Sequence, residues 1–288
     1  MSVDVRRVRP LLIPPPDPHQ TPSRFRMRAA LLRTEFRAAV QPIVCLGDGG
    51  LHGFEVLLRW PGGPPPDVFV PAAERAGLAH PVGHWVLDRA AAIASKLQVE
   101  GTSCPLSVNV SACQIEDPNF ASNVATTLSR HWLTGAALSL ELTETFALRN
   151  LAQAAETVRQ LRQMGCAVGL DDFGTGYSTV RLLTELPVSF IKLDRTFVSK
   201  LHTLAGRAVT EHFMSLARAL RLGVVAEGVE TEQQAHALRE SGARFAQGFL
   251  FARPADLAPG ESPLVPQHVC SAGSLLGELG DTPVDSGW

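Results

Sequence analysis

Acidic and amide side chains, together with one lysine, recur along this chain inside or just after short apolar segments. The series comprises Glu55, Asn109, Glu141, Asp171, Asp172, Lys192, Asp194, Glu227 and Gln247. One carboxylate in such a place is ordinarily a helix cap or a surface ion pair. Carboxylates that converge repel one another and lose hydration, so a whole series of them indicates a site for a hard cation.

The ligand types narrow the choice of cation. All candidate ligand atoms in the series are oxygens, and the nine histidines form no HxxEH-like cluster. Oxygen ligands without histidine or cysteine favour Mg²⁺ or Mn²⁺ over Zn²⁺. The adjacent Asp171 and Asp172 can both reach a pair of ions if they stand at a strand-to-loop junction. Two ions about 4 Å apart suit an in-line displacement at phosphorus, in which water attacks a phosphodiester.

Short apolar or β-branched segments, which alternate with longer helical patterns, would position these side chains. The predicted strands are Ala39–Leu46, Leu51–Leu58, Pro105–Val110, Leu138–Leu142, Ala167–Asp171, Phe190–Asp194, Gly223–Ala226 and Phe245–Phe249. The sequence Gly-Asp-Gly-Gly at 47–50 predicts a hairpin, so one strand is expected to be antiparallel. We therefore predict an α/β fold, a TIM-like (β/α)8 barrel with one antiparallel strand, whose active-site groups gather at the strand ends.

Composition and charge exclude several classes of protein. The chain has 288 residues, of which 45% are hydrophobic and 19% charged, and its formal net charge is −2. Such a weak charge argues against duplex nucleic acid or a membrane as partner, and no apolar run approaches the roughly 20 residues of a spanning helix. We expect a cytoplasmic protein. The five cysteines lack CxxC spacing, which favours reduced structural thiols.

The two ends of the chain differ from its middle. Residues 1–27 hold Pro-Pro-Pro at 14–16 and several arginines, which predicts a flexible arm. Residues 259–288 are rich in Gly, Ser and Pro and predict a loosely ordered tail. We therefore predict that residues 28–258 form the domain that contains the barrel.

An ordered series of motifs resembles the EAL-domain family of cyclic di-GMP phosphodiesterases over about residues 31–254. The motifs are Gln-Pro-Ile at Gln41, Glu-Val-Leu-Leu-Arg-Trp at Glu55, Asn-Val-Ser at Asn109, Glu-Leu-Thr-Glu at Glu141, Asp-Asp-Phe-Gly-Thr-Gly-Tyr-Ser at Asp171, Ile-Lys-Leu-Asp at Ile191, Ala-Glu-Gly-Val-Glu at Ala226 and Gln-Gly-Phe at Gln247. Three departures stand out: Val56 in the name-giving Glu-Ala-Leu, Phe249 in place of a Tyr, and Cys113 where an Arg is frequent. None of them removes a metal ligand.

The resemblance implies a set of metal ligands. One ion would be held by Glu55, Asn109, Glu141 and Asp171, and the second by Asp171, Asp172 and Glu227. Both ions would be Mg²⁺ or Mn²⁺.

The resemblance also implies roles for other residues, with Glu55, Glu227, Lys192 and Glu144 as the catalytic group. Lys192 would orient the attacking water or balance charge on the phosphate. Glu144, one helical turn beyond Glu141, would steady the loop after Asp172. In the substrate pocket, Arg59 would contact a phosphate, and Gln41 and Gln247 would line the walls.

The implied function is hydrolysis of cyclic di-GMP to linear pGpG by two-metal-assisted attack of water on a phosphodiester, which lowers the level of this second messenger. The alternative is a non-catalytic receptor that binds the same nucleotide and signals through a protein partner. A module that binds only protein ranks lower. Retention of all the ligands and of Lys192 favours the enzyme. The resemblance further implies a homodimer, and regulation would come from a regulatory protein partner.

Overall fold

The computed structural model describes residues 21–143, 148–174, 179–257 and 263. The strands are β1 Arg37–Cys45, β2 Leu51–Arg59, β3 Leu106–Val110, β4 Leu138–Thr143, β5 Ala167–Phe173, β6 Phe190–Leu193, β7 Gly223–Ala226, β8 Phe245–Ala246 and β9 Ala255–Leu257. The helices are α1 Arg24–Leu32, α2 Pro66–Arg75, α3 Ala79–Val99, α4 Ala112–Ile115, α5 Phe120–Arg130, η1 Gly135–Ala137, α6 Leu151–Gln163, α7 Thr179–Glu185, α8 Arg195–Val198, α9 Leu204–Ala219 and α10 Glu232–Glu240.

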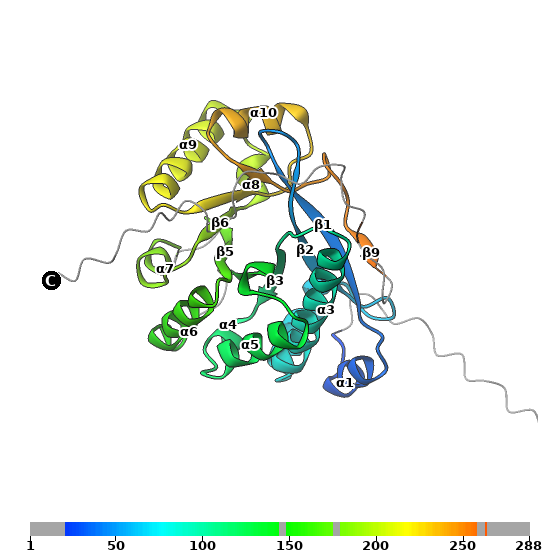
Figure 1. Cartoon of the computed structure of the whole chain (residues 1–288). Coiled ribbons are helices and arrows are strands. Elements are labelled where there is room, and N and C mark those ends of the chain that lie inside the picture. Colours follow the sequence, from blue (N-terminus) through cyan, green and yellow to red (C-terminus); the bar gives the residue numbers. More distant parts are fainter. Residues whose placement is uncertain (1–20, 144–147, 175–178, 258–262, 264–288) are drawn as a thin grey trace, which may run out of the picture.

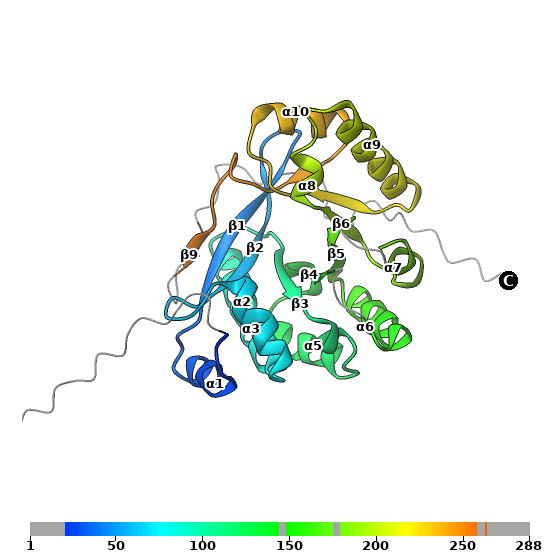
Figure 2. The same cartoon turned by 180° about the vertical axis from the view of Figure 1, so that it is seen from behind.

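Strands β1 to β8 close into a barrel, and the helices lie around it (Figures 1 and 2). β2 to β8 pair in parallel in chain order, whereas β1 runs antiparallel to both β2 and β8 and closes the ring. The turn between β1 and β2 places Gly49 at φ +72°, a conformation that glycine adopts without steric cost. The predicted hairpin, the antiparallel strand and the TIM-like barrel are confirmed.

Several strand bounds differ from the prediction, and three differences from the predicted elements have an identifiable cause. β8 ends at Ala246 because the chain then turns against the β7–α10 loop, where an added Cβ on Gly248 would lie 2.1 Å from the Val229 carbonyl oxygen. β9 was not predicted, since its three residues form a strand only by pairing with β1. α1 begins at Arg24, inside the predicted arm, because Ser23 caps it and Met27 and Ala30 are buried.

The barrel interior explains why the polar residues meet at one rim. Ile43, Cys45, Ala167, Phe190, Val225 and Phe245 form an apolar cluster within the barrel. Lys192, two residues beyond Phe190, has its side chain on the same face of β6 because strand side chains alternate. The same spacing separates Val225 from Glu227 and Phe245 from Gln247. An apolar floor therefore supports a polar layer at the strand ends.

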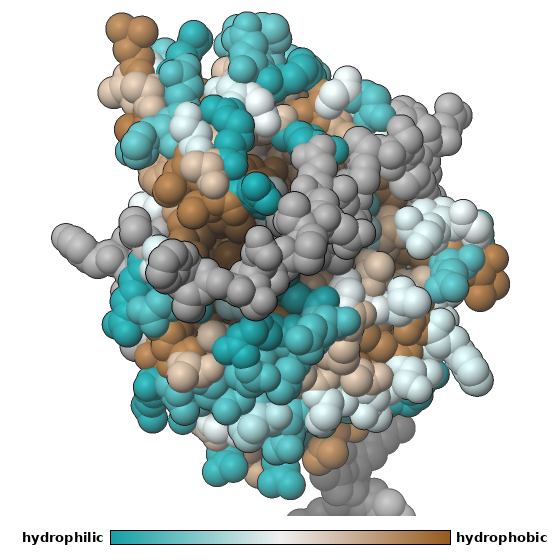
Figure 3. Space-filling view, turned by 60° about the vertical axis from the view of Figure 1, so that its left-hand side comes forward, coloured by the Kyte–Doolittle hydropathy of each residue, from teal (hydrophilic) through white to brown (hydrophobic). Residues whose placement is uncertain are grey.

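Most large hydrophobic side chains of the described residues are buried, in the main core formed by the strands and the helices around them or in a second cluster beside α1 and α2. On the face drawn in Figure 3, hydrophobic residues gather around a hollow and hydrophilic residues cover much of the rest. Within the described ranges, the helices are too short or too polar to cross a membrane.

The cysteines of the described residues confirm the prediction in part. Cys104, Cys113 and Cys166 are free thiols, as expected, whereas Cys45 is disulfide-bonded. The prediction is wrong for Cys45 because the spacing of cysteines in a sequence does not show which distant segments meet.

Gly169 tests the packing of this floor. An added Cβ would lie 2.4 Å from the Phe190 ring, so Gly169→Ala is expected to lower the free energy of unfolding by about 1–3 kcal/mol through overpacking. Gly47→Ala is the matched control, because open space surrounds that position, and it should change the value by less than about 1 kcal/mol. Urea unfolding of both variants measures the difference, and equal midpoints would contradict the packing argument.

Candidate functional site

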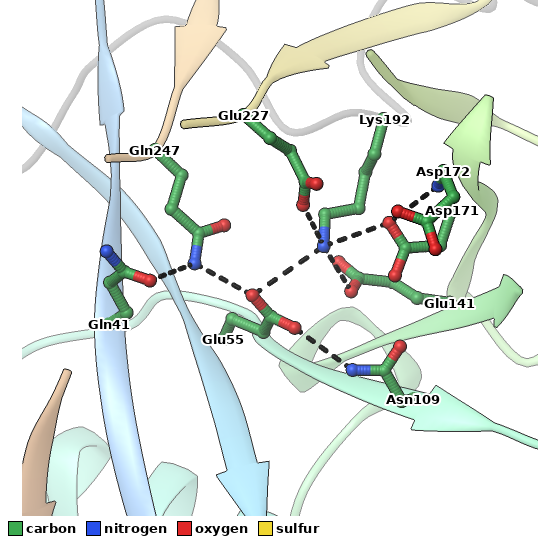
Figure 4. Close-up of polar contacts among 9 residues, drawn as sticks. All are labelled: Gln41, Glu55, Asn109, Glu141, Asp171, Asp172, Lys192, Glu227 and Gln247. Carbon is green, nitrogen blue, oxygen red and sulfur yellow. Dashed lines mark hydrogen bonds and ion pairs between the residues drawn. The ribbon is translucent and has the colours of Figure 1, made fainter. Parts of the chain in front are cut away.

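Nine polar residues, on β1 to β6 and directly after β7 and β8, converge at the carboxyl ends of the parallel strands (Figure 4). They are Gln41, Glu55, Asn109, Glu141, Asp171, Asp172, Lys192, Glu227 and Gln247. All except Gln41, which the family resemblance implied, belong to the series that the sequence singled out. Asp194 alone of that series turns away, where it caps α8 by accepting a hydrogen bond from the Thr196 backbone N–H. The structure thus brings the predicted metal ligands and Lys192 together.

Lys192 lies at the centre of the group and is 1% exposed. Its Nζ atom is 2.5 Å from Glu227 Oε1, 2.9 Å from Glu141 Oε2, 3.3 Å from Asp171 Oδ1 and 3.6 Å from Glu55 Oε2. An ammonium this deeply buried is tolerated only when carboxylates surround it. The four carboxylates come from four different strands or strand ends, so one cation ties together distant parts of the barrel.

Burial and mutual charge shift the pKa values in this group. Burial of the Lys192 ammonium opposes its charge, but the carboxylates, Glu141 foremost, outweigh burial and hold its pKa well above the ordinary value. Burial raises the pKa of Glu141 to about 8, an effect that Lys192 opposes and that Glu55 and Asp171 reinforce. Burial also raises the pKa of Glu227 well above its ordinary value. Without further cations, the site is therefore short of positive charge.

Amide side chains fix the orientation of Glu55. Asn109 Nδ2 donates to Glu55 Oε1 at 3.0 Å, and Gln247 Nε2 donates to Glu55 Oε2 at 2.7 Å. Gln247 Nε2 also donates to Gln41 Oε1 at 2.9 Å, and Gln41 Nε2 donates to the Ala252 carbonyl at 3.0 Å. The amide of Gln41 is therefore occupied at both ends, which suits it to hold Gln247 in place.

Asp171 and Asp172 reach the same space although they are neighbours in sequence. Asp172 adopts φ +53°, and the pairing of β5 with β6 shifts register just before Phe173, so the alternation of side chains is broken there. One oxygen from each of Asp171, Asp172 and Glu227 lies within 4.8 Å of the others. This is the trio that the family resemblance implied for the second ion.

The donor set fits hard divalent cations. Glu141 Oε1 and Gln247 Oε1 are buried acceptors without a hydrogen-bond partner among the described residues. A buried acceptor without a donor is costly, and a cation or a donor on a ligand would satisfy it. Together with the oxygen trio of Asp171, Asp172 and Glu227, these unpartnered oxygens match the ligands that Mg²⁺ and Mn²⁺ prefer.

Two cavities adjoin the polar cluster. The smaller, of about 280 Å³, is lined by Gln41, Glu55, Leu57, Asp171, Lys192, Arg195, Glu227, Gly228, Glu230, Gln247, Gly248 and Phe249. The larger, of about 540 Å³, runs along α2 and α3 and is also lined by Asn109, Asp172 and Arg59. Leu57 borders both cavities. A ligand that reaches the carboxylates thus has room on either side of them.

Not every predicted site residue lies in the central cluster. Arg59 lines the larger cavity, and its Nη1 donates to the carbonyl of the neighbouring Leu58 at 3.1 Å. Glu144 lies outside the described residues. The sequence reasoning missed Arg195 and Glu230, which line the smaller cavity. Both stand within quoted motifs or directly after one, so their place in sequence was the available signal.

The raised pKa of Glu141 predicts how the metal-free protein responds to pH. Its pKa is about 8 in the folded protein and 4.5 ordinarily, so between these values the unfolded chain releases a proton that the folded protein keeps. This contribution to the free energy of unfolding is complete below pH 4.5 and is lost as pH rises toward 8. Glu141→Gln removes the titration and preserves the shape of the side chain.

Urea unfolding in EDTA from pH 4.5 to 8 tests this expectation. The stability of the wild type should fall relative to that of Glu141→Gln as pH rises, and Mg²⁺ or Mn²⁺ should reduce the difference. Parallel pH profiles for the two proteins would show that Glu141 ionises as it does in water.

Comparison with solved structures shows the same architecture in proteins of known ligand. The PaMucR phosphodiesterase in complex with c-di-GMP is 38% identical, with a TM-score of 0.73 over 80% of this chain and 95% of that one. The EAL enzyme Bd1971 with cAMP and cyclic-di-GMP bound is 34% identical, with a TM-score of 0.74 over 80% of this chain and 64% of that one.

Sequence comparison finds relatives that are named cyclic di-GMP phosphodiesterases. The cyclic di-GMP phosphodiesterase RocR from Pseudomonas aeruginosa is 40% identical over 76% of this chain. MucR from the same organism, a bifunctional diguanylate cyclase/cyclic di-GMP phosphodiesterase, is 39% identical over 79% of it. The chain spans 57% of RocR and 34% of MucR, so less than two thirds of either relative. Residues 25–254 match the model of the EAL domain, and this chain belongs to the EAL domain family.

Proposed function

We propose that this chain hydrolyses cyclic di-GMP to linear pGpG, with two divalent cations, Mg²⁺ or Mn²⁺, assisting the attack of water on a phosphodiester. The observation that carries the proposal is the cluster of carboxylates around the buried Lys192, with the buried acceptor Glu141 Oε1 left without a partner. The names of RocR and of the PaMucR complex support the choice of nucleotide.

Charge balance supports two ions rather than one. Glu55, Glu141, Asp171 and Glu227 are all paired with the one ammonium of Lys192. When these four are ionised, their charge exceeds that of Lys192 by about three, which is more than one divalent cation neutralises. Bound cations of this kind lower the pKa of an attacking water and stabilise the oxygen that leaves phosphorus.

The side chains of the chain itself would bind and orient the reactants. Lys192 fixes the positions of four ligand carboxylates and supplies positive charge near the phosphate. Gln247 presents its unpartnered Oε1 to the substrate while its Nε2 anchors Glu55. Arg59, which lines the larger cavity, would contact a phosphate of the nucleotide.

The two cavities suit a substrate with two nucleotide halves. Leu57 lines both cavities, and residues of the polar cluster line each of them. A cyclic dinucleotide laid across both cavities would put one phosphodiester over the carboxylates and one base in each cavity. The phosphate held at the centre would then be the one attacked, because only there do ligand oxygens flank it on both sides.

Removal of metal provides the first test. The purified protein is incubated with cyclic di-GMP and Mg²⁺ or Mn²⁺, and the products are separated by chromatography. We expect pGpG in these samples, none in EDTA, and recovery when excess Mn²⁺ is added back. Binding of intact nucleotide without turnover would instead support the receptor function, and absence of both would remove the proposal.

Loss of one ligand provides the second test. Changes to groups that only support metal ligands commonly cost 10–100-fold, so Glu55→Ala should reduce turnover by more than about a hundredfold. Glu211→Ala, an exposed carboxylate on α9, is the matched control and should leave turnover unchanged. Initial rates at saturating Mn²⁺ measure the effect. Full activity of Glu55→Ala would refute the assigned ligand set.

A further inference from the structure

Arg26, on α1, makes three contacts that reach beyond its own helix. Its Nη1 donates to Glu35 Oε2 at 2.6 Å, and its Nη2 donates to the Gly62 carbonyl at 3.3 Å. The guanidinium carbon also lies 4.8 Å from the centroid of the Trp60 ring. A planar guanidinium can serve a carboxylate, a carbonyl and an aromatic face at once, which a lysine cannot.

Glu35 connects Arg26 to the edge of the same indole. Trp60 Nε1 donates to Glu35 Oε2 at 3.1 Å. The hydrogen bond from Arg26 is the main cause that holds the pKa of Glu35 below its ordinary value, so the carboxylate stays charged at neutral pH. Arg26, Glu35 and Trp60, which we call the α1 clamp, therefore form one polar unit around a single tryptophan.

The ring of Trp60 is closely packed as well as hydrogen-bonded. It is 4% exposed, and its centroid lies 5.5 Å from that of Phe36 and 5.7 Å from that of Phe69, which belongs to α2. A Cβ added to Gly63 would lie 2.2 Å from the ring, so the β2–α2 connection wraps closely around it. A shift of this ring must therefore move the connection and α2 with it.

The segments on either side of Trp60 form one wall of the larger cavity. Arg59 precedes it directly, and α2 contributes Pro66, Val70 and Glu74 to the lining. Glu55 lies on β2, the strand that leads into Trp60, but among the described residues no hydrogen bond or ion pair joins the clamp to Lys192 or its carboxylates. The clamp thus lies behind one wall of the cavity, apart from the carboxylate cluster.

We propose that Arg26 is a positioning residue for the substrate, which through Glu35 and Trp60 holds Arg59 and α2 in the arrangement that binds the nucleotide. This inference rests on the proposed function. It assigns to α1 a part in substrate affinity and none in the chemical step, so the two kinetic constants should separate.

Arg26→Gln tests the role of the clamp. We expect KM for cyclic di-GMP to rise about fivefold, because a charge-assisted hydrogen bond and a ring contact are lost, while kcat and the Mn²⁺ requirement stay unchanged. Arg26→Lys keeps the charge opposite Glu35 and should recover part of the loss. Arg28→Gln removes the same charge from an exposed position on the other side of α1 and should leave KM unchanged.

Two further measurements separate positioning from a purely structural role. Melting temperatures identify loss of fold, and nucleotide affinity measured in EDTA, where no turnover occurs, should weaken by the same factor as KM rises. The positioning role would be overturned by an unchanged KM in Arg26→Gln, or by a variant in which both kcat and the melting temperature fall. The proposed function would stand in either case. Wild-type protein that neither binds nor hydrolyses cyclic di-GMP would overturn both.

Discussion

The buried ammonium of Lys192 is the constraint on which the polar half of the barrel depends. Four carboxylates approach it to within 3.6 Å, and without it they would repel one another in a space with little water. Burial nevertheless lifts the pKa of Glu141 to about 8, and the single ammonium of Lys192 offsets this only in part. In the metal-free fold, Lys192 therefore reduces the repulsion among the carboxylates, and the remaining negative charge favours the binding of divalent cations.

The strand period carries this arrangement from the sequence to the site. Phe190, Val225 and Phe245 fill the barrel, and the residues two positions later are Lys192, Glu227 and Gln247. Each of these three strands thus places an apolar residue inside the barrel and a polar residue at its carboxyl end. Hydrophobic burial and assembly of the site therefore depend on the same register. A slip of one residue in any strand would exchange interior and exterior side chains and remove its member of the site.

Much of this was predictable from sequence because it depends on local pattern. Strands such as Leu138–Thr143 can be recognised by their apolar residues, and the glycine-rich turn at 47–50 predicts the hairpin. β9 was missed because three residues carry no pattern of their own, and α1 was masked by its arginines. The hydrogen bond between Gln41 and Gln247 was missed for another reason. It depends on which segments face each other across the barrel, which the order of residues does not show.

The reversed direction of β1 decides where the chain enters the barrel. Arg37, its first residue, pairs with Arg59 at the end of β2, so the chain arrives at the rim that carries the carboxylates. In a barrel of uniformly parallel strands, the incoming chain would arrive at the opposite end. α1, which leads into this strand, is thereby joined to the barrel at the rim beside the larger cavity. A displacement of α1 would reach Arg59 through the Trp60 indole, without having to pass through the barrel wall.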